Sequence, residues 1–359
     1  MVKLPQKNVN QKLNSKFTFN TEKINMKIIH IVPEFQEGGV ERYVLQLCHE
    51  QVKHGHHVTL ATAGGKLEKF LPEDNMKVIH LPVHRKNIFT GIHCVRTLSK
   101  INDWDIIHAH SRVPAWIAWR TSIITKTSWV MTAHAPYSLN IGIKPFRHAD
   151  GVICVSESVR EELKGYLPEN TITIPNGIRK PSFLWEGKYF PENRKFLYVG
   201  YLARRKGLDT VFNALGQLKH YDWTLDVVGD GSQKHELESL AESLGISERI
   251  KFYGFRDDTD EFMSKASCLL FPSHSEGFGL VVAEALAVGL PVLASDLEPL
   301  RPFSSGSLLP HDDVSAWTEA IERVINGGSA SPLSADKLIM FEETAQRTED
   351  FYRKILNSK

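Results

Sequence analysis

Short apolar runs recur along the whole chain and alternate with segments in which apolar residues return every three or four positions. In the first half these runs are residues 27–32, 57–62, 76–83, 105–110, 128–134, 151–156 and 172–177. In the second half they are residues 195–202, 224–231, 250–255, 268–273 and 290–296. Continuous apolar runs are typical of strands buried on both faces, and the segments between them have the period of amphipathic helices. The pattern therefore predicts an α/β protein with doubly wound parallel sheets.

Residues 181–194 interrupt this alternation, because they are rich in proline and charge and have no clear period. We therefore predict two Rossmann-like domains, residues 26–180 and 195–335, joined by that linker. In such a pair, ligands bind where the carboxyl ends of the strands of both sheets face one central cleft. Residues 336–359 show apolar positions at helical spacing, and we expect this helix to pack back on the N-terminal domain. Residues 1–25 are polar and lysine-rich without an apolar core, which indicates a disordered tail rather than a secretory signal.

Composition and charge narrow the class of protein. The 359 residues contain no apolar run as long as a membrane-spanning helix, and the four cysteines are scattered, which fits a reducing cytoplasm. The net charge of +1 hides an asymmetry: residues 1–180 carry 24 Lys and Arg against 15 Asp and Glu, or +9, and the remainder carries 19 against 27, or −8. The two halves could therefore meet different partners, or each could simply be solubilised by its own charges.

Two glutamates lie eight positions apart in the otherwise apolar stretch 273–296. An ionised carboxylate in such surroundings needs a partner. Because residues 268–273 are expected to form a buried strand, Glu276 lies in the loop at its carboxyl end. A helix then begins near Gly279 and ends at Gly289, so Glu284 lies inside it.

The amides of Phe278, Gly279 and Leu280 would point out of the start of this helix and, with the helix dipole, form an anion site. A nucleoside diphosphate-sugar fits this arrangement, with its phosphate on the helix end, its ribose hydroxyls on Glu284 and its sugar hydroxyls on Glu276. The alternative is an ordinary helix start with one solvated glutamate.

Together with other motifs, this pair of glutamates resembles the E-x7-E hallmark of the retaining glycosyltransferases of family 4, which have the GT-B fold. The resemblance covers residues 26 to about 358. The supporting motifs are EGGVERYV (37–44), DIIHAHS (105–111), TAH (132–134), VSESVREEL (155–163), IPNGI (174–178), ARRKGLD (203–209), VVGDGSQKHEL (227–237) and KFYGF (251–255). The resemblance implies two Rossmann-like domains facing a central cleft, and transfer of a sugar from a nucleoside diphosphate-sugar to a hydroxyl with retention at the anomeric carbon.

The resemblance also implies roles for individual residues of the first domain. Gly38 and Gly39 are expected against the donor diphosphate, where bare amides at a helix start can bind it; a simple tight turn is the alternative. His110 matches a histidine beside the donor sugar, and His134 is expected at another strand end on the acceptor side of the cleft. His108 is interpreted as a core residue on the opposite side of its strand.

In the second domain, Lys206 matches the family lysine that neutralises the leaving diphosphate. The family usually has an arginine where this chain has Tyr201, so we expect Arg204 or Arg205 to supply the second cation, and choose Arg205. Gly231 and Phe255 are expected near the nucleotide. The alternative for each cation is a solvated loop charge.

We expect no cofactor and no divalent metal, and no nucleic-acid partner. Asp258-Thr259-Asp260 spells the D-x-D of metal-dependent glycosyltransferases of another fold, but it precedes a helical pattern and is interpreted as a helix cap. The first strand lacks the G-x-G-x-x-G that a Rossmann dehydrogenase needs.

The acceptor is expected on the basic first domain and is interpreted as a glycan or a lipid-linked saccharide. Residues 84–100 carry Arg85, Lys86, Arg96 and Lys100 and no acid, interleaved with apolar residues. This composition suits an anionic membrane surface, although a basic helix packed on its own domain is the alternative. The hypothesis is a cytoplasmic enzyme that makes bacterial polysaccharide or lipopolysaccharide. It includes peripheral contact of this enzyme with the inner face of the cytoplasmic membrane. The alternative is a catalytically inactive nucleotide-binding scaffold of the same fold.

Overall fold

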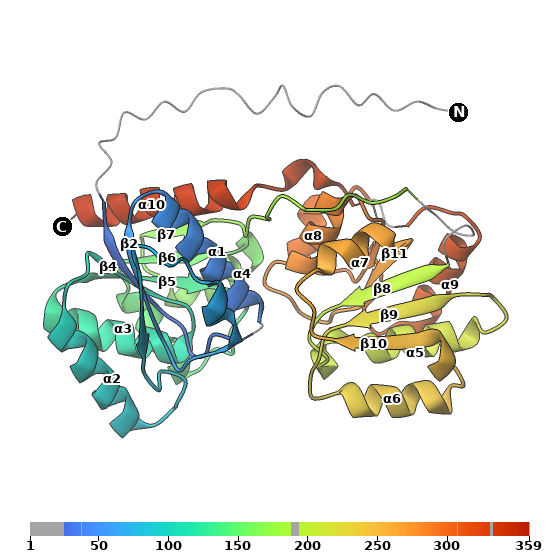
Figure 1. The fold of residues 1–359 in the computed structure, drawn as a ribbon, viewed down its shortest axis with the longest axis horizontal. Helices are drawn as coiled ribbons and strands as arrows, with labels where there is room; N and C mark the ends of the chain where they lie inside the picture. Colours follow the sequence, from blue (N-terminus) through green and yellow to red (C-terminus); the bar gives the residue numbers. More distant parts are fainter. Residues whose placement is uncertain (1–24, 37, 188–193, 307, 331–332, 359) are drawn as a thin grey trace.

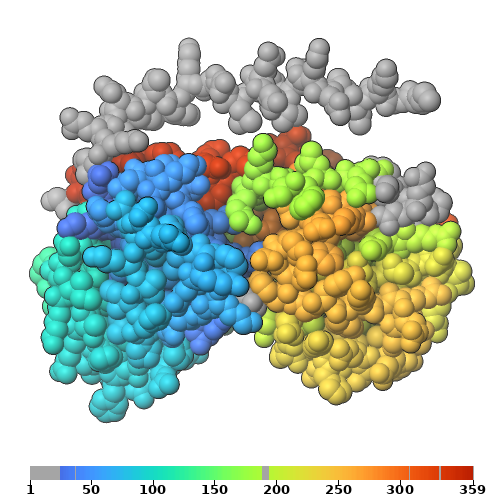
Figure 2. All heavy atoms as spheres, viewed as in Figure 1, coloured from blue at the N-terminus to red at the C-terminus, as the bar shows by residue number. Residues whose placement is uncertain are grey.

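The computed structural model describes residues 25–36, 38–187, 194–306, 308–330 and 333–358. The predicted tail therefore lies almost wholly outside the described residues, and so does part of the predicted linker. The described chain forms two lobes, each built around one parallel sheet (Figure 1). Figure 2 shows that the lobes touch along a seam in the middle of the molecule, where the first lobe, in blue, meets the second, in orange.

The first sheet has seven strands in the order β3-β2-β1-β4-β5-β6-β7, and all neighbours are parallel. The strands are β1 (Lys27–Ile31), β2 (His57–Thr62), β3 (Met76–His80), β4 (Ile106–Ala109), β5 (Ser128–Ala133), β6 (Gly151–Cys154) and β7 (Thr171–Thr173). Helices α1 (Gly39–Lys53) and α10 (Phe341–Asn357) cover one face, and α2 (Ile88–Ile101) and α3 (Arg112–Thr125) cover the other (Figure 1). The short helix α4 (Glu157–Leu163) follows β6.

The second sheet has five strands in the order β10-β9-β8-β11-β12, again with parallel neighbours. They are β8 (Lys195–Val199), β9 (Thr224–Val228), β10 (Ile250–Gly254), β11 (Cys268–Phe271) and β12 (Val292–Ala294). One face is covered by α5 (Leu208–Gln217), α6 (Lys234–Ser243) and α9 (Val314–Ile325), and the other by α7 (Thr259–Lys265) and α8 (Leu280–Val288). All twelve predicted strands and the predicted fold class are confirmed.

The chain crosses between the lobes twice, and the two crossings lie side by side. Ile178 donates its amide to the carbonyl of Ile339 at 3.0 Å, and Phe341 donates to the carbonyl of Ile178 at 2.9 Å. From there α10 runs across the first sheet, where Phe351, Tyr352 and Ile355 are buried against β1, β4, β5 and β6 (Figure 1). The regular α-helix begins at Phe341 rather than near residue 336, because residues 335–337 form a separate 3-10 turn. No helix in the described part of the chain is long and apolar enough to cross a membrane.

Candidate active site

The N-termini of α1 and α8 face each other across the seam between the lobes. A side-chain carbon added to Gly39 would lie 3.8 Å from a methyl group of Leu280. Within the described residues, the amides of Phe278, Gly279 and Leu280 have no hydrogen-bond acceptor, and Gly279 has a left-handed backbone (φ 87°) that few other residues adopt. The structure thus brings Gly39 to the predicted anion site at the start of α8, and leaves that site open to a ligand.

The start of α1 differs from this expectation. The carboxylate of Glu41 folds back on its own helix, so that a side-chain carbon on Gly38 would lie 2.1 Å from Glu41 Oε2. Burial raises the pKa of this carboxyl. An acid at the helix start repels a second anion, so the α8 end is the stronger of the two candidate diphosphate sites, and the part played by Gly38 requires Glu41 to turn away.

The loop between β11 and α8 also approaches the first lobe more closely than any side chain would allow. A side-chain carbon on Gly277 would lie 1.9 Å from the carbonyl oxygen of His134. Nearby, the Ser156 hydroxyl at the start of α4 donates to the carbonyl of Gly277 at 2.8 Å. The first lobe therefore holds, by direct backbone contact, the loop that carries Glu276.

Lys206 and Glu276, which are 70 residues apart in sequence, form an ion pair at the carboxyl end of the second sheet. Both side chains are 13% exposed. Ser273 donates to the same carboxylate oxygen, Glu276 Oε1, at 2.7 Å, and the Lys206 ammonium lies 5.8 Å from the centroid of Phe271. The predicted lysine and the first predicted glutamate are thus together beside the start of α8.

The loops after β8 and β9 lie at the same edge of the sheet. Side-chain carbons on Gly231 and Gly229 would lie 2.3 Å from the carbonyl oxygen of Leu202 and 1.9 Å from that of Gly200, so glycine allows the two loops to pack backbone to backbone. Arg205 has an exposed side chain, and its carbonyl accepts the amide of His274 at 2.8 Å, in the loop that carries Glu276. Tyr201 is also exposed.

Glu284 lies near the positive charges of two arginines that were not predicted as site residues. Burial raises the pKa of this carboxyl, and the nearby charges of Arg42 and Arg179, both from the first half of the chain, oppose that rise. Arg42 also stacks on Phe255, with 5.2 Å between guanidinium carbon and ring centroid, and donates to the carbonyl of Arg256 at 3.2 Å. Arg42 therefore links α1 to the predicted nucleotide side of the second lobe. In the sequence, only its position three residues after Gly39 could have indicated that Arg42 belongs to the site.

The histidines are arranged differently from the prediction. His110 is fully buried, and both of its ring nitrogens are engaged: Nδ1 with His134 Nε2 at 3.1 Å, and Nε2 with His30 Nδ1 at 2.9 Å. It has no nitrogen left for a sugar hydroxyl in this arrangement. His134 is partly exposed beside Gly277. His108 is a buried core residue, as expected, but it lies on the same side of the strand as His110, with ring centroids 4.0 Å apart, because residues two apart in a strand share a face.

The rings of His30, His108 and His110 come within the distance of shared metal ligands. Every ring nitrogen of these three residues nevertheless has a hydrogen-bond partner within the protein. Asp258 stands at the start of α7, as predicted, but its carboxylate pairs with Arg256 instead of capping the helix amides.

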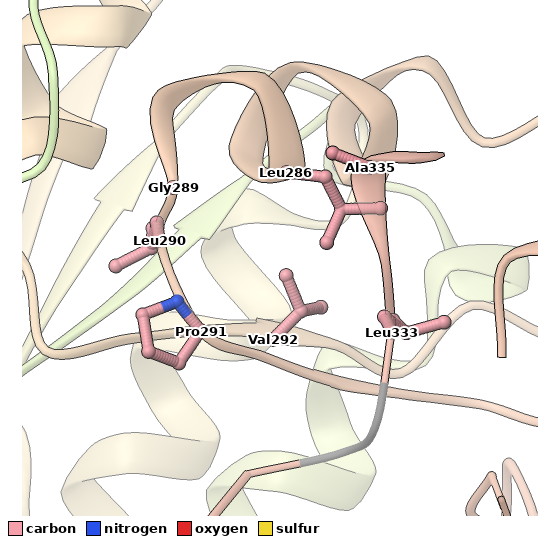
Figure 3. Close-up of a pocket in the computed structure, with 7 residues that line it drawn as sticks. All are labelled: Leu286, Gly289, Leu290, Pro291, Val292, Leu333 and Ala335. Carbon is pink, nitrogen blue, oxygen red and sulfur yellow. The ribbon is translucent and has the colours of Figure 1, made fainter. Parts of the chain in front are cut away.

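A separate hollow of about 170 Å³ lies at the other end of α8 (Figure 3). Its lining is Leu286, Gly289, Leu290, Pro291, Val292, Leu333 and Ala335. These side chains carry no titratable or charged group, so this hollow offers a diphosphate no cation, and the candidate site is the seam at the opposite end of the helix.

Comparison with known proteins agrees with this geometry. Residues 37–180 match the family described as Glycosyltransferase Family 4, and residues 183–339 match Glycosyl transferases group 1. An uncharacterised glycosyltransferase of Methanocaldococcus jannaschii is 30% identical over 241 residues, which is 61% of this chain and 65% of that relative. A phosphatidyl-myo-inositol mannosyltransferase of Mycobacterium leprae is 29% identical over 315 residues, covering 79% of this chain and 83% of its own length.

A lipopolysaccharide core biosynthesis glycosyltransferase of Rhizobium meliloti is 25% identical over 232 residues, covering 60% of this chain and 66% of the relative. Among solved structures, HepE of Anabaena in complex with UDP and glucose superposes with a TM-score of 0.78 at 20% identity, over 91% of this chain and 99% of that chain. At 20% sequence identity this superposition is evidence for the fold alone.

Proposed function

Because the chain belongs to the group 1 and family 4 glycosyltransferases of GT-B fold, we propose that it is a retaining enzyme acting on a nucleoside diphosphate-sugar. The acceptor we propose is a hydroxyl of a glycan or a lipid-linked saccharide. The observation that carries the proposal is the open start of α8, whose free amides lie beside Lys206 and face α1 across the seam.

The chemistry requires stabilisation of a leaving diphosphate. The bond between the anomeric carbon and the diphosphate oxygen breaks, and that oxygen keeps both electrons. The acceptor oxygen bonds to the same face of the carbon, and its proton passes to the departing phosphate oxygen. In this proposal Lys206, Arg205 and the amides of residues 278–280 stabilise the growing negative charge. No divalent metal is needed in this scheme, because these groups supply the positive charge.

We propose that donor binding breaks the ion pair between Lys206 and Glu276. A bound diphosphate competes for the lysine, which frees the Glu276 carboxylate to accept hydrogen bonds from hydroxyls of the transferred sugar. We propose that Glu284, which lies near the charge of Arg42, accepts hydrogen bonds from the ribose hydroxyls of the nucleotide; Arg42 itself stacks on Phe255. We assign the imidazole that faces the sugar to His134, since His110 has neither exposed surface nor a free ring nitrogen.

Relatives support the choice of donor and acceptor class. HepE was solved with UDP and glucose, and curated relatives are named for lipopolysaccharide core and phosphatidyl-inositol glycolipid synthesis. We therefore propose a role in bacterial cell-surface polysaccharide or lipopolysaccharide synthesis in the cytoplasm, where nucleotide-sugars are the donors.

The test is a thermal-shift screen of the full chain against UDP-, GDP- and ADP-sugars, followed by a nucleotide-release assay with the donors that bind. We expect one donor class to raise the melting temperature, and Lys206→Met to reduce release at least tenfold, while the exposed control Lys337→Met leaves it unchanged. Tight binding without turnover on any acceptor would favour the inactive scaffold. Binding of no nucleotide-sugar at all would refute both.

We also propose that the N-terminal half of α2 contacts an anionic membrane surface. Ile88, Phe89 and Ile92 are 74%, 79% and 44% exposed, and Arg85 and Lys86 lie just before them in sequence. Other apolar positions of the same segment, Val95 and Leu98, pack into the domain core instead. The segment thus combines a buried half with an exposed apolar tip flanked by cations, which suits shallow insertion among acidic headgroups.

Vesicle sedimentation tests the membrane contact. We expect the protein to bind phosphatidylglycerol vesicles more than phosphatidylcholine vesicles, and Phe89→Ser to weaken that binding. Leu184→Ser is the matched control, because it removes a similarly exposed apolar side chain (70%) from the segment that joins the lobes. Equal and negligible binding to both vesicle types would remove the membrane proposal without touching the glycosyl transfer.

A further inference from the structure

Seven side chains in the first lobe form one unbroken series of hydrogen bonds. They come from β1, β4, β5 and the residues that follow these strands, together with α1 and α10. The contacts are His134 Nε2 to His110 Nδ1 (3.1 Å), His110 Nε2 to His30 Nδ1 (2.9 Å), His30 Nε2 to Gln51 Oε1 (2.8 Å), Gln51 Nε2 to Tyr352 OH (3.5 Å), Tyr352 OH to His108 Nδ1 (2.5 Å) and His108 Nε2 to Thr132 Oγ1 (2.7 Å). We call these seven residues the imidazole chain. It begins at the seam between the lobes, where His134 lies against Gly277, and ends under α10, which lies across the sheet in Figure 1.

The orientation of the Gln51 amide sets the direction of every hydrogen bond between Gln51 and His134. Its amide oxygen can only accept, so His30 carries its proton on Nε2 and leaves Nδ1 as an acceptor. His110 must then donate from Nε2, which leaves its own Nδ1 as an acceptor. His134 in turn donates from Nε2. Its other nitrogen, Nδ1, is therefore unprotonated and has no partner among the described residues.

The other side of Gln51 holds the amide in this orientation. Its nitrogen donates to the Tyr352 hydroxyl, which donates its own hydrogen to His108 Nδ1, and His108 donates to Thr132. A rotated amide would place N–H groups against His30 and an oxygen against Tyr352, and the whole series would have to reverse. The orientation of the Gln51 amide, with its oxygen towards His30 and its nitrogen towards Tyr352, therefore sets the direction of the series, although both side chains are fully buried.

The surroundings keep the imidazoles neutral. Burial lowers the pKa of His30 to about 4 and that of His134 to about 3, and it lowers those of His108 and His110 as well. The titratable groups packed against the series from α1 and α10 are Tyr43, Cys48 and Glu349, and burial raises the pKa of Tyr43 and of Cys48. A neutral imidazole has one donor and one acceptor, which is what a series of one fixed direction requires.

We infer that Gln51 and Tyr352 are positioning residues: through His30 and His110 they set the tautomer of His134, so that Nδ1, its ring nitrogen without a partner among the described residues, is unprotonated. This inference rests on the proposed function for the use of that nitrogen, which accepts a hydrogen bond from a donor-sugar hydroxyl. The tautomer itself is independent of any activity.

Nitrogen-15 NMR of the full chain with labelled histidine tests the tautomer directly. In the unaltered protein, His134 is expected neutral at pH 7 with its proton on Nε2, its signals being assigned with His134→Gln. Gln51→Leu removes the oxygen that accepts the His30 Nε2 proton. The hydrogen bonds among His30, His110 and His134 are then more stable in the reverse direction, and the proton of His134 is expected to move to Nδ1. A packing defect at residue 51 would not reach the protonated nitrogen of a ring two imidazoles away.

Two further variants keep the test sharp if Gln51→Leu does not fold. Tyr352→Phe keeps the buried ring and removes only the hydroxyl, which frees the Gln51 amide to rotate and should give a mixture of both His134 tautomers. Ile355→Val is the matched control, because it lies nearly one turn later on α10, is equally buried, and has no polar side-chain atom to bond to the series. It should leave the spectrum of His134 unchanged.

An Nδ1 proton on His134 in the unaltered protein would overturn the inference. So would an unchanged tautomer in folded Gln51→Leu or Tyr352→Phe. Zinc found at one equivalent by elemental analysis, with the ring nitrogens of His30, His108 and His110 as ligands, would also overturn it, since a metal-bound nitrogen carries no proton.

The activity arm separates this inference from the proposed function. Reversal of the series should lower kcat about tenfold while the KM for donor stays within twofold, because His134 still occupies its place but offers a proton where an acceptor is needed. If the tautomer reverses and turnover does not change, the tautomer setting stands and the assigned role of His134 fails.

Discussion

Replacing Gly277 by alanine tests whether the two lobes must touch at the β11–α8 loop. The backbone of this glycine is not left-handed, so alanine adds a steric effect alone. The new methyl carbon would lie 1.9 Å from the carbonyl oxygen of His134 and 3.0 Å from the Cα of Ala135, and both neighbours are backbone atoms that cannot turn aside. The loop and the first lobe must therefore separate by about 1 Å or more to reach an ordinary contact.

That shift acts on the reacting groups, because Glu276 is the next residue to Gly277 and pairs with Lys206. A displacement of about 1 Å at a catalytic group can cost roughly 10²-fold in rate. The folded lobes keep their cores, and the separation breaks the Ser156 hydrogen bond between them, which contributes about 0.5–1.5 kcal/mol. We therefore expect kcat/KM to fall by about 100-fold while the melting temperature falls by only about 2–4 °C.

The assay is nucleotide release with the donor found in the screen, alongside a thermal melt. Gly165→Ala is the control, because a side-chain carbon there meets no atom within 4 Å. Ser156→Ala removes the hydrogen bond without adding bulk, and should cost less than tenfold. Turnover of Gly277→Ala at the unaltered rate would refute the reasoning, and so would an equal loss in Gly165→Ala.

Three further predictions concern the two glutamates, Arg205 and the buried histidines. Glu284→Ala should raise the donor Kd by about 10–100-fold, because Glu284 is assigned to the ribose. Glu276→Ala should lower kcat more than it weakens binding, because Glu276 is assigned to the transferred sugar. Calorimetry and kinetics measure both effects, and unchanged constants would contradict the assignment. Arg205→Ala should weaken donor binding more than tenfold at low salt and by less as salt is added, because the charge is exposed; an effect below about twofold at low salt would mean a solvated cation. The free energy of unfolding should also fall as the pH is lowered. Burial depresses the folded-state pKa of His30 to about 4 and that of His134 to about 3, below the pKa of an unfolded histidine (about 6.5), so the unfolded state binds more protons. Each histidine therefore contributes a loss of at most about 1.4 kcal/mol per pH unit as the pH falls from about 6.5 to 4. Urea titrations at stepped pH measure this loss, and a constant unfolding free energy over that range would contradict it.

The pattern of the sequence determined the elements of this protein because the information is local. Continuous apolar runs identified every strand, and glycines such as Gly289, which has a left-handed backbone (φ 93°), identified helix ends. The positions of Glu276 in a loop and Glu284 inside a helix follow from the same reading. Lys206 could be found because it lies in a motif on one short turn.

The tertiary structure decided what depends on contacts between distant segments. Strand register and the packing of α1 and α10 buried His110 between two other histidines, which its neighbours in sequence could not reveal. The link from Arg42 to Phe255, more than 200 residues away, arises only when the lobes meet. A local pattern fixes which face a side chain takes in its own strand or helix, whereas its partners are set by how those elements pack, and packing is a property of the whole chain.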